Sequence, residues 1–115
     1  MKSDAVFLEH ILNETEFILE NTAGLSYPEF LENLVLKKAV VQSFGVIGEA
    51  ANQISDEFQK QHPEIDWKGM TGFRNRLIHK YFDINFSQVW EIIEEDIPTL
   101  NTQILEILKN NSEEP

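Results

Sequence analysis

Apolar residues recur along most of the chain at intervals of three and four positions, the spacing of one face of an α-helix. No stretch alternates apolar and polar residues over a length that would indicate a β-sheet. The pattern therefore predicts an all-α protein. The expected elements are long helices at about 4–24, 34–61, 66–82 and 86–109, and a short helix that begins after Ser26.

Each long helix has one apolar face, and these faces should pack together as the core. The expected inward residues are Leu8, Ile11, Leu12, Thr15, Ile18, Leu19, Leu34, Val41, Phe44, Ile47, Ala51, Ile54, Phe58, Met70, Phe73, Leu77, Ile78, Tyr81, Trp90, Ile93, Ile97, Leu100, Ile104 and Leu108. Four such helices with short connections predict an antiparallel four-helix bundle with one additional short helix. We expect residues 1–115 to form a single domain, folded over about 4–109 and frayed at 110–115.

Cap and turn residues mark the helix ends. Asp4 is the expected N-cap of the first helix, which should end near Gly24. Ser26-Tyr27-Pro28-Glu29 has the form of a capping box with proline in the first turn. His62-Pro63 should close the 34–61 helix, and Pro98 predicts a kink or break just before it.

Two glycines, Gly45 and Gly48, lie within the predicted 34–61 helix. A glycine inside a helix costs roughly 1 kcal/mol relative to alanine. This cost predicts that another helix approaches closely at these positions.

Composition limits the available chemistry. The chain contains no cysteine, which removes disulfides, thiolate metal sites and thiol nucleophiles. No apolar run approaches the roughly 18 to 20 residues needed to cross a bilayer, and the N-terminal residues lack the apolar segment of a signal peptide. We therefore expect a cytoplasmic protein that does not associate with membranes.

The net charge of -11 argues against broad binding to a phosphate backbone. The basic residues are unevenly distributed, however. Lys68, Arg74, Arg76 and Lys80 fall between Asp66 and Asp83, a stretch without acidic residues that holds four of the nine lysines and arginines. Charge alone leaves two interpretations open, which are a local phosphate site and a helix face that pairs with acidic neighbours.

Arg74 lies in the middle of the apolar stripe of the predicted 66–82 helix. A guanidinium there must reach a partner or a solvated cavity, because burial of an unpaired charge is very unfavourable. It could form an internal salt bridge, for example to Glu49, or extend to solvent, or bind an anion.

Asn75 and His79 are four residues apart, so on a helix they would share one face, and the asparagine could orient the imidazole. A lone surface histidine can equally be merely solvated. On an ideal helix Arg74 and His79 would point about 140° apart. Convergence of the two would then need the reach of arginine, a local distortion or a second subunit.

The motif Arg74-Asn75-X-X-X-His79-X-Tyr81 resembles the R-X4-6-H signature of the HEPN superfamily, in the form typical of HepT-like toxins of HEPN/MNT toxin-antitoxin pairs. The resemblance covers about residues 4–109. Further matching segments are, in order, Gly24-Leu25-Ser26 followed by Phe30, Ile47-Gly48-Glu49-Ala50-Ala51, His62-Pro63-Glu64-Ile65-Asp66-Trp67, and Val89-Trp90 leading to Asp96-Ile97-Pro98. The ordered set is more specific than the arginine-to-histidine spacing alone.

This resemblance implies an HEPN-type bundle that cleaves RNA internally, without a metal or other cofactor, and leaves 2',3'-cyclic phosphate ends. Arg74 and His79 would be the catalytic pair, with Asn75 in support. Lys68, Arg76 and Lys80 are then candidates for binding RNA.

Members of the family form homodimers with the cleft between protomers, so two copies of this chain would each supply an arginine and a histidine. In HepT-like toxins the tyrosine at the position of Tyr81 receives AMP from a minimal nucleotidyltransferase (MNT), the antitoxin. The added charge would repel RNA. Tyr81 could instead be an ordinary core residue whose hydroxyl reaches water.

Other functions also fit a HEPN bundle. A non-catalytic module that binds nucleotides or proteins is one, and a structural dimer held by the polar motif is another. A metal hydrolase is poorly supported, because the sequence has no cluster of histidines and carboxylates at ligand spacing.

Overall fold

The computed structural model describes the backbone of residues 3–80 and 83–113, with their side chains except those of 74, 78–80 and 111–113. Within these residues the elements are α1 (Asp4–Thr22), α2 (Tyr27–Glu32), α3 (Leu34–Gln53), α4 (Asp56–Gln61), α5 (Trp67–Thr71), α6 (Phe73–Leu77), β1 (Ile78–Lys80), β2 (Asp83–Ile84), α7 (Phe86–Glu95) and α8 (Ile97–Glu113).

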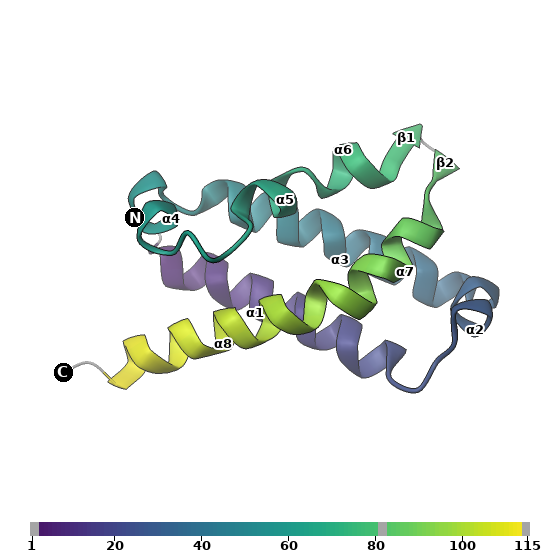
Figure 1. Ribbon diagram of the computed structural model, residues 1–115, viewed down its shortest axis with the longest axis horizontal. Helices are drawn as coiled ribbons and strands as arrows, with labels where there is room; N and C mark the ends of the chain where they lie inside the picture. Colours follow the sequence, from purple (N-terminus) through teal and green to yellow (C-terminus); the bar gives the residue numbers. More distant parts are fainter. Residues whose placement is uncertain (1–2, 81–82, 114–115) are drawn as a thin grey trace.

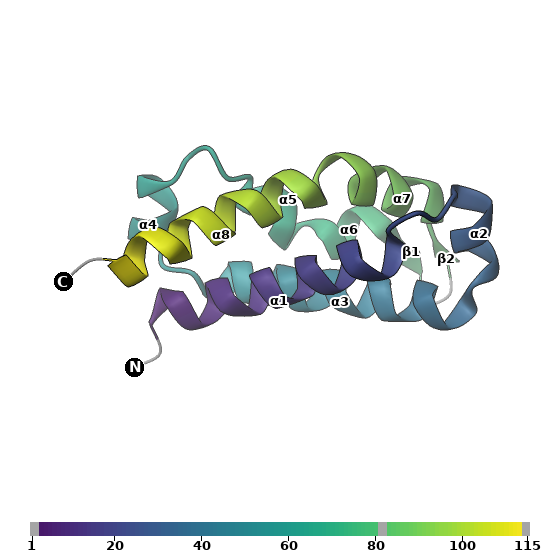
Figure 2. The same ribbon diagram turned by 90° about the horizontal axis from the view of Figure 1, so that it is seen from below.

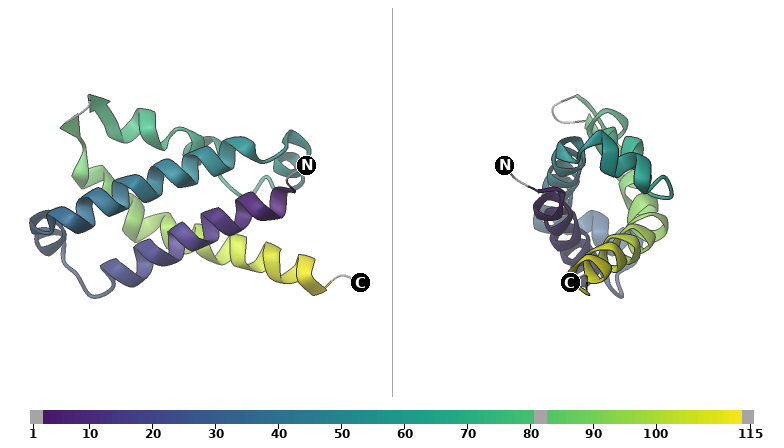
Figure 3. Two further views of the ribbon diagram at one scale, coloured as in Figure 1. Left: turned by 180° about the vertical axis from the view of Figure 1, so that it is seen from behind. Right: turned by 90° about the vertical axis from the view of Figure 1, so that its left-hand side faces the viewer.

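The helices form an antiparallel bundle in which α3 runs back along α1, α5 and α6 run forward again, and α7 and α8 return (Figure 1). In Figure 2, α1 and α3 form one layer and α5 to α8 the other. Seen end-on, the helices of the two layers lie around one common centre (Figure 3, right). The all-α four-helix prediction is confirmed. The described segments contain a second short helix, α4, and a small hairpin of β1 and β2.

The core is apolar and continuous through the bundle. It includes most of the predicted inward residues, and among the most deeply buried are Leu8, Ile11, Phe30, Val40, Ile47, Val89, Ile97 and Ile104. Leu34 was expected in the core but is 59% exposed. It is the first residue of α3, and the core residues of that helix begin only at Leu36. The inward prediction for Leu34 is therefore wrong.

The predicted capping box at the start of α2 is present. The Ser26 N–H donates to Glu29 Oε1 at 2.9 Å, and Ser26 Oγ accepts from the Glu29 N–H at 3.3 Å. The hydrogen bond from the Ser26 backbone, and then that from its side chain, lowers the pKa of Glu29 below its ordinary value. Because the folded pKa is lowered, this stabilisation is present above the ordinary pKa and is lost as pH falls through the lowered value.

The predicted continuous helix from 34 to 61 is wrong, because it breaks at Ile54 and Ser55. Ser55 Oγ accepts from the Phe58 N–H at 3.2 Å and so caps α4. The Ser55 N–H and hydroxyl both donate to the Asp4 carboxylate, at 2.9 and 2.8 Å. Asp4 is the first residue of α1 and Ser3 is the N-cap, so the expected capping role of Asp4 is also wrong.

The other predicted helix ends agree with the structure, except the end of α8. α1 ends at Thr22, and Gly24 has a positive φ of 78° that favours glycine. α4 ends before His62-Pro63. The break before Pro98 is confirmed by the separation of α7 from α8 at Asp96. α8 continues to Glu113 instead of ending near Lys109.

Candidate functional site

The basic segment does not form the single helix expected over 66–82. α5 ends at Gly72, whose N–H donates to the Lys68 carbonyl at 3.0 Å, and α6 then ends at Leu77. The chain continues as β1, which pairs antiparallel with β2 so that Ile78 lies opposite Ile84. The helix prediction is therefore wrong at Gly72 and at residues 78–80, and residues 81–82 lie outside the described ones.

This local structure changes the relation between the two expected catalytic residues. Arg74 belongs to α6, whereas His79 belongs to the extended strand β1. The 140° separation expected on one ideal helix therefore does not apply. The side chains of Arg74, His79 and Lys80 lie outside the described ones, and Tyr81 lies outside the described residues, so their convergence stays a prediction.

The helices that carry the motif pack tightly on α3. Phe73 and Leu77 of α6 are buried, and the Phe73 ring centroid lies 5.0 Å from that of Phe44. A Cβ placed on Gly48 would lie 2.9 Å from the Met70 carbonyl oxygen, closer than real Cβ atoms come. The predicted close approach is confirmed at Gly48. It is wrong at Gly45, where a Cβ would meet nothing within 4 Å.

The start of α5 is held by two hydrogen bonds. The Asp66 carboxylate accepts from the Gly69 N–H at 2.9 Å and caps the helix. The indole N–H of Trp67 donates to the His62 carbonyl at 3.0 Å. These bonds fix the loop between α4 and α5, and so fix the direction in which the motif segment leaves it.

The far end of the motif is fixed by the start of α7. The Asn85 N–H donates to the Leu77 carbonyl at 2.9 Å, and the Asn85 side chain caps α7 by accepting from the Gln88 N–H at 3.1 Å. Phe86 then packs edge-on against Phe30 of α2, with ring centroids 6.3 Å apart. The sequence contains this Asn-X-X-Gln cap signal, which was not among the predicted helix caps.

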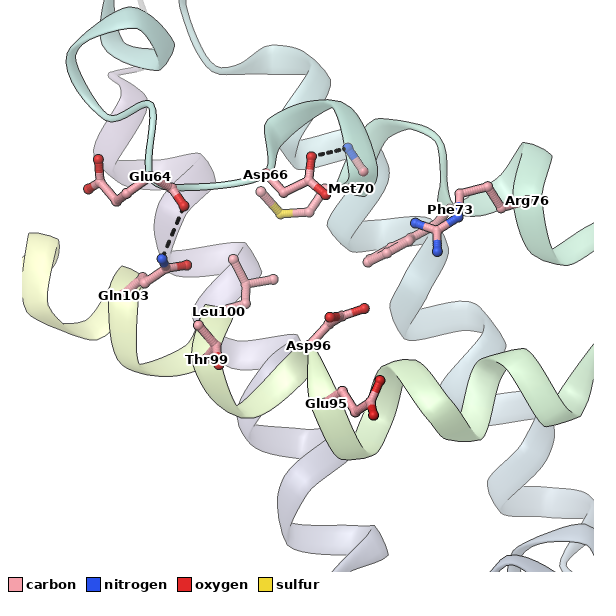
Figure 4. A pocket seen from close by; sticks show the side chains of 11 residues that line it. Glu64, Asp66, Met70, Phe73, Arg76, Glu95, Asp96, Thr99, Leu100 and Gln103 are labelled. Carbon is pink, nitrogen blue, oxygen red and sulfur yellow. Dashed lines mark hydrogen bonds between the residues drawn. The ribbon is translucent and has the colours of Figure 1, made fainter.

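A pocket of about 190 Å³ opens between α5 and α6 on one side and α7 and α8 on the other. Figure 4 shows the Arg76 guanidinium on the wall opposite Glu95 and Asp96. Glu64 and Asp66 add two more carboxylates to the lining. Arg76 makes no ion pair with any side chain that is described.

The two expected RNA-binding cations whose side chains are described, Lys68 and Arg76, do not line the same pocket. Lys68 lines a different hollow, between α4 and α5. Asn75, the expected supporting residue, is exposed on α6. Arg76 therefore faces an acidic surface, where the surrounding carboxylates weaken its attraction for phosphate.

Two further features are absent from the described residues. No helix among them is both long and apolar enough to cross a membrane. Nor do they contain a group of three or more histidines and carboxylates that could hold a metal ion.

Comparison with known proteins identifies the family. The family described as "Ribonuclease HepT-like" matches residues 11–107, which include the whole motif segment. The chain belongs to the HepT-like ribonuclease family. No solved structure matches it significantly.

Individual HepT-like relatives match over nearly their full length. "Putative RNase TTE0752" of Caldanaerobacter subterraneus subsp. tengcongensis is 42% identical, over 95% of this chain and 97% of the relative. "Putative RNase MJ1380" of Methanocaldococcus jannaschii is 38% identical, over 85% and 90%. "Probable ribonuclease HepT" of Thermococcus cleftensis is 34% identical, over 94% and 98%. The resemblance to HepT-like proteins noted from the motif is thereby confirmed.

Proposed function

We propose that this HepT-like chain is a ribonuclease toxin of the cytoplasm, which cleaves RNA internally and without a metal. The observation that carries the proposal is the family match over residues 11–107, within which the full motif from Arg74 to Tyr81 is intact. The relatives' names support the same activity.

His79 and Arg74 have side chains suited to this reaction. An RNA 2'-hydroxyl attacks the adjacent phosphorus when a base removes its proton and an acid protonates the leaving 5'-oxygen. Imidazole does both near neutral pH. The forked donors of a guanidinium stabilise the charge that develops on the phosphoryl oxygens. The products would then carry 2',3'-cyclic phosphate and 5'-hydroxyl ends.

We further propose that the active unit is a homodimer with its cleft at the interface. Each chain has one histidine in the motif segment, whereas His10 and His62 lie on α1 and at the end of α4. Two copies would provide one imidazole as base and another as acid. They would also double the lysines and arginines near the scissile phosphate.

Cleavage by the purified chain tests the activity. We expect RNA to be cut in the presence of a chelator, with fragments that mass spectrometry identifies as 2',3'-cyclic phosphates. Activity that disappears in chelator and returns with a divalent metal would contradict the metal-independent reaction. Absence of any cleavage, together with binding of nucleotides or proteins, would favour a non-catalytic HEPN module.

Tyr81 is the proposed site of control by a nucleotidyltransferase antitoxin. Transfer of AMP from ATP to the phenol oxygen would release pyrophosphate and place a negative charge beside the cleft, where it would repel RNA. We expect expression of the chain alone to arrest growth, and co-expression of the antitoxin to restore growth and add one adenylyl mass. Tyr81→Phe should remain toxic and unmodified. Modification mapped to the other tyrosine, Tyr27, would contradict this assignment.

A further inference from the structure

A groove runs between α3, α4 and α5, on a different side of α5 from the acidic pocket. Its wider part has a volume of about 550 Å³. Asn52 of α3, Lys60 of α4, and Lys68 and Thr71 of α5 line it. We call it the α3–α5 groove, and Figure 1 shows the three helices around it.

The α3–α5 groove continues toward the motif. A narrower hollow of about 270 Å³ shares Asn52 and Thr71 with it and extends along α3 to Phe44. The Phe44 ring contacts Phe73, which directly precedes Arg74 in α6. At 1.5 Å per residue, the helix from Phe44 to Asn52 spans about 12 Å. The groove thus connects the lysine end with the helix that carries the proposed catalytic arginine.

The side chains at the wide end are suited to a phosphate backbone. Lys60 and Lys68 are exposed, and their ammonium groups form no ion pair or hydrogen bond with the described side chains. Asn52 and Thr71 are also exposed. The Asn52 amide can bond a base edge or a ribose oxygen. The Thr71 hydroxyl donates to the Lys68 carbonyl at 3.1 Å, so it can offer only its oxygen as an acceptor.

Three carboxylates line the groove and outnumber its two lysines. Glu49 lines the narrow part of the groove, and Asp56 and Asp66 line the wide part. The Asp66 carboxylate is already bonded to the Gly69 N–H at the start of α5. Strong binding of any polyanion is therefore not expected here, but two unpaired ammonium groups at one end of a continuous groove can hold individual phosphates.

We propose that the α3–α5 groove binds the single-stranded RNA that flanks the scissile phosphate. In this proposal Lys60 and Lys68 contact phosphates, and Asn52 contacts a base or a ribose. The inference rests on the proposed ribonuclease function. It adds a subsite away from the catalytic pair, so long RNA gains contacts that short RNA lacks.

Binding of non-cleavable RNA tests the subsite separately from catalysis. We would measure fluorescence anisotropy with labelled 2'-O-methyl oligonucleotides of about 4 and 12 nucleotides, for the wild-type chain and for Lys60→Gln/Lys68→Gln. Loss of two phosphate contacts should lower the salt slope for the 12-mer by about 1.4 and its affinity at 0.1 M salt about 10- to 30-fold. Affinity for the 4-mer should change little.

Two matched variants define the outcome. Lys38→Gln/Lys109→Gln removes the same two charges from exposed positions that do not line the groove, and it should leave 12-mer affinity unchanged. Asn52→Ala should weaken 12-mer binding without altering the salt slope. Wild-type affinity and salt slope in the double variant would overturn the subsite, as would equal losses for both oligonucleotides. A changed oligomeric mass with unchanged RNA binding would overturn it in favour of a protein interface. Cleavage by the wild-type chain, measured separately, decides the proposed function.

Discussion

Replacement of His79 by alanine is expected to lower the rate of RNA cleavage about 100- to 10,000-fold, the usual contribution of a positioned general acid or base. The variant should keep its helical circular dichroism, since β1 is a three-residue strand at the edge of the bundle. Single-turnover cleavage of a defined oligonucleotide measures the effect without interference from product release.

His10→Ala is the matched control. His10 is exposed on α1, and its ring lies 6.4 Å from that of Phe7, so its removal should leave cleavage unchanged. Size-exclusion chromatography with light scattering measures the oligomeric state of each variant, and so shows whether a loss of cleavage is caused by a loss of the dimer. Full activity of the His79→Ala variant would show that His79 takes no part in the reaction. A His79→Ala variant that is monomeric would show instead that the motif acts by holding the dimer together.

Gly48→Ala should destabilise the fold by up to about 2 kcal/mol. The new Cβ would lie 2.9 Å from the Met70 carbonyl oxygen, so α3 and α5 must separate slightly. Overpacking of this kind costs about 1–3 kcal/mol, and the gain in helix propensity, roughly 1 kcal/mol, offsets only part of it. Urea denaturation monitored by circular dichroism gives the free energy of unfolding.

Gly45→Ala makes the same change three residues earlier in α3 and should have the opposite sign. No atom lies within 4 Å of the added Cβ, so the propensity gain of roughly 0.5–1 kcal/mol remains as net stabilisation. Equal effects of the two substitutions would show that helix propensity, and not the approach of α5, determines stability at Gly48.

Features encoded by neighbouring residues were predictable from the sequence. Helical periodicity predicted the all-α bundle, the Ser26 capping box marked the start of α2, and Pro98 marked the break between α7 and α8. Each of these depends on residues within one or two turns of each other. The motif from Arg74 to Tyr81 was also recognisable because its residue types and spacing are local.

Features that depend on strand pairing or on packing between helices were not predictable in this way. Leu77 and Ile78 continue the apolar stripe of a helix, but residue 78 instead pairs with Ile84 in β2. The glycines in α3 looked equivalent, and only the position of Met70 distinguishes them. The separation of Arg76 from Lys68 likewise follows from how α5 and α6 pack between α3 and α8.

The bond between Asp4 and Ser55 links residues 51 positions apart in the chain. During synthesis at about 5–20 residues per second, Asp4 leaves the ribosome roughly 3–10 seconds before its partner. For that interval the apolar face of α1, including Leu8 and Ile11, has no completed α3 to cover it. The nascent N-terminal helix therefore exposes its apolar face to water until the chain that covers it has been synthesised.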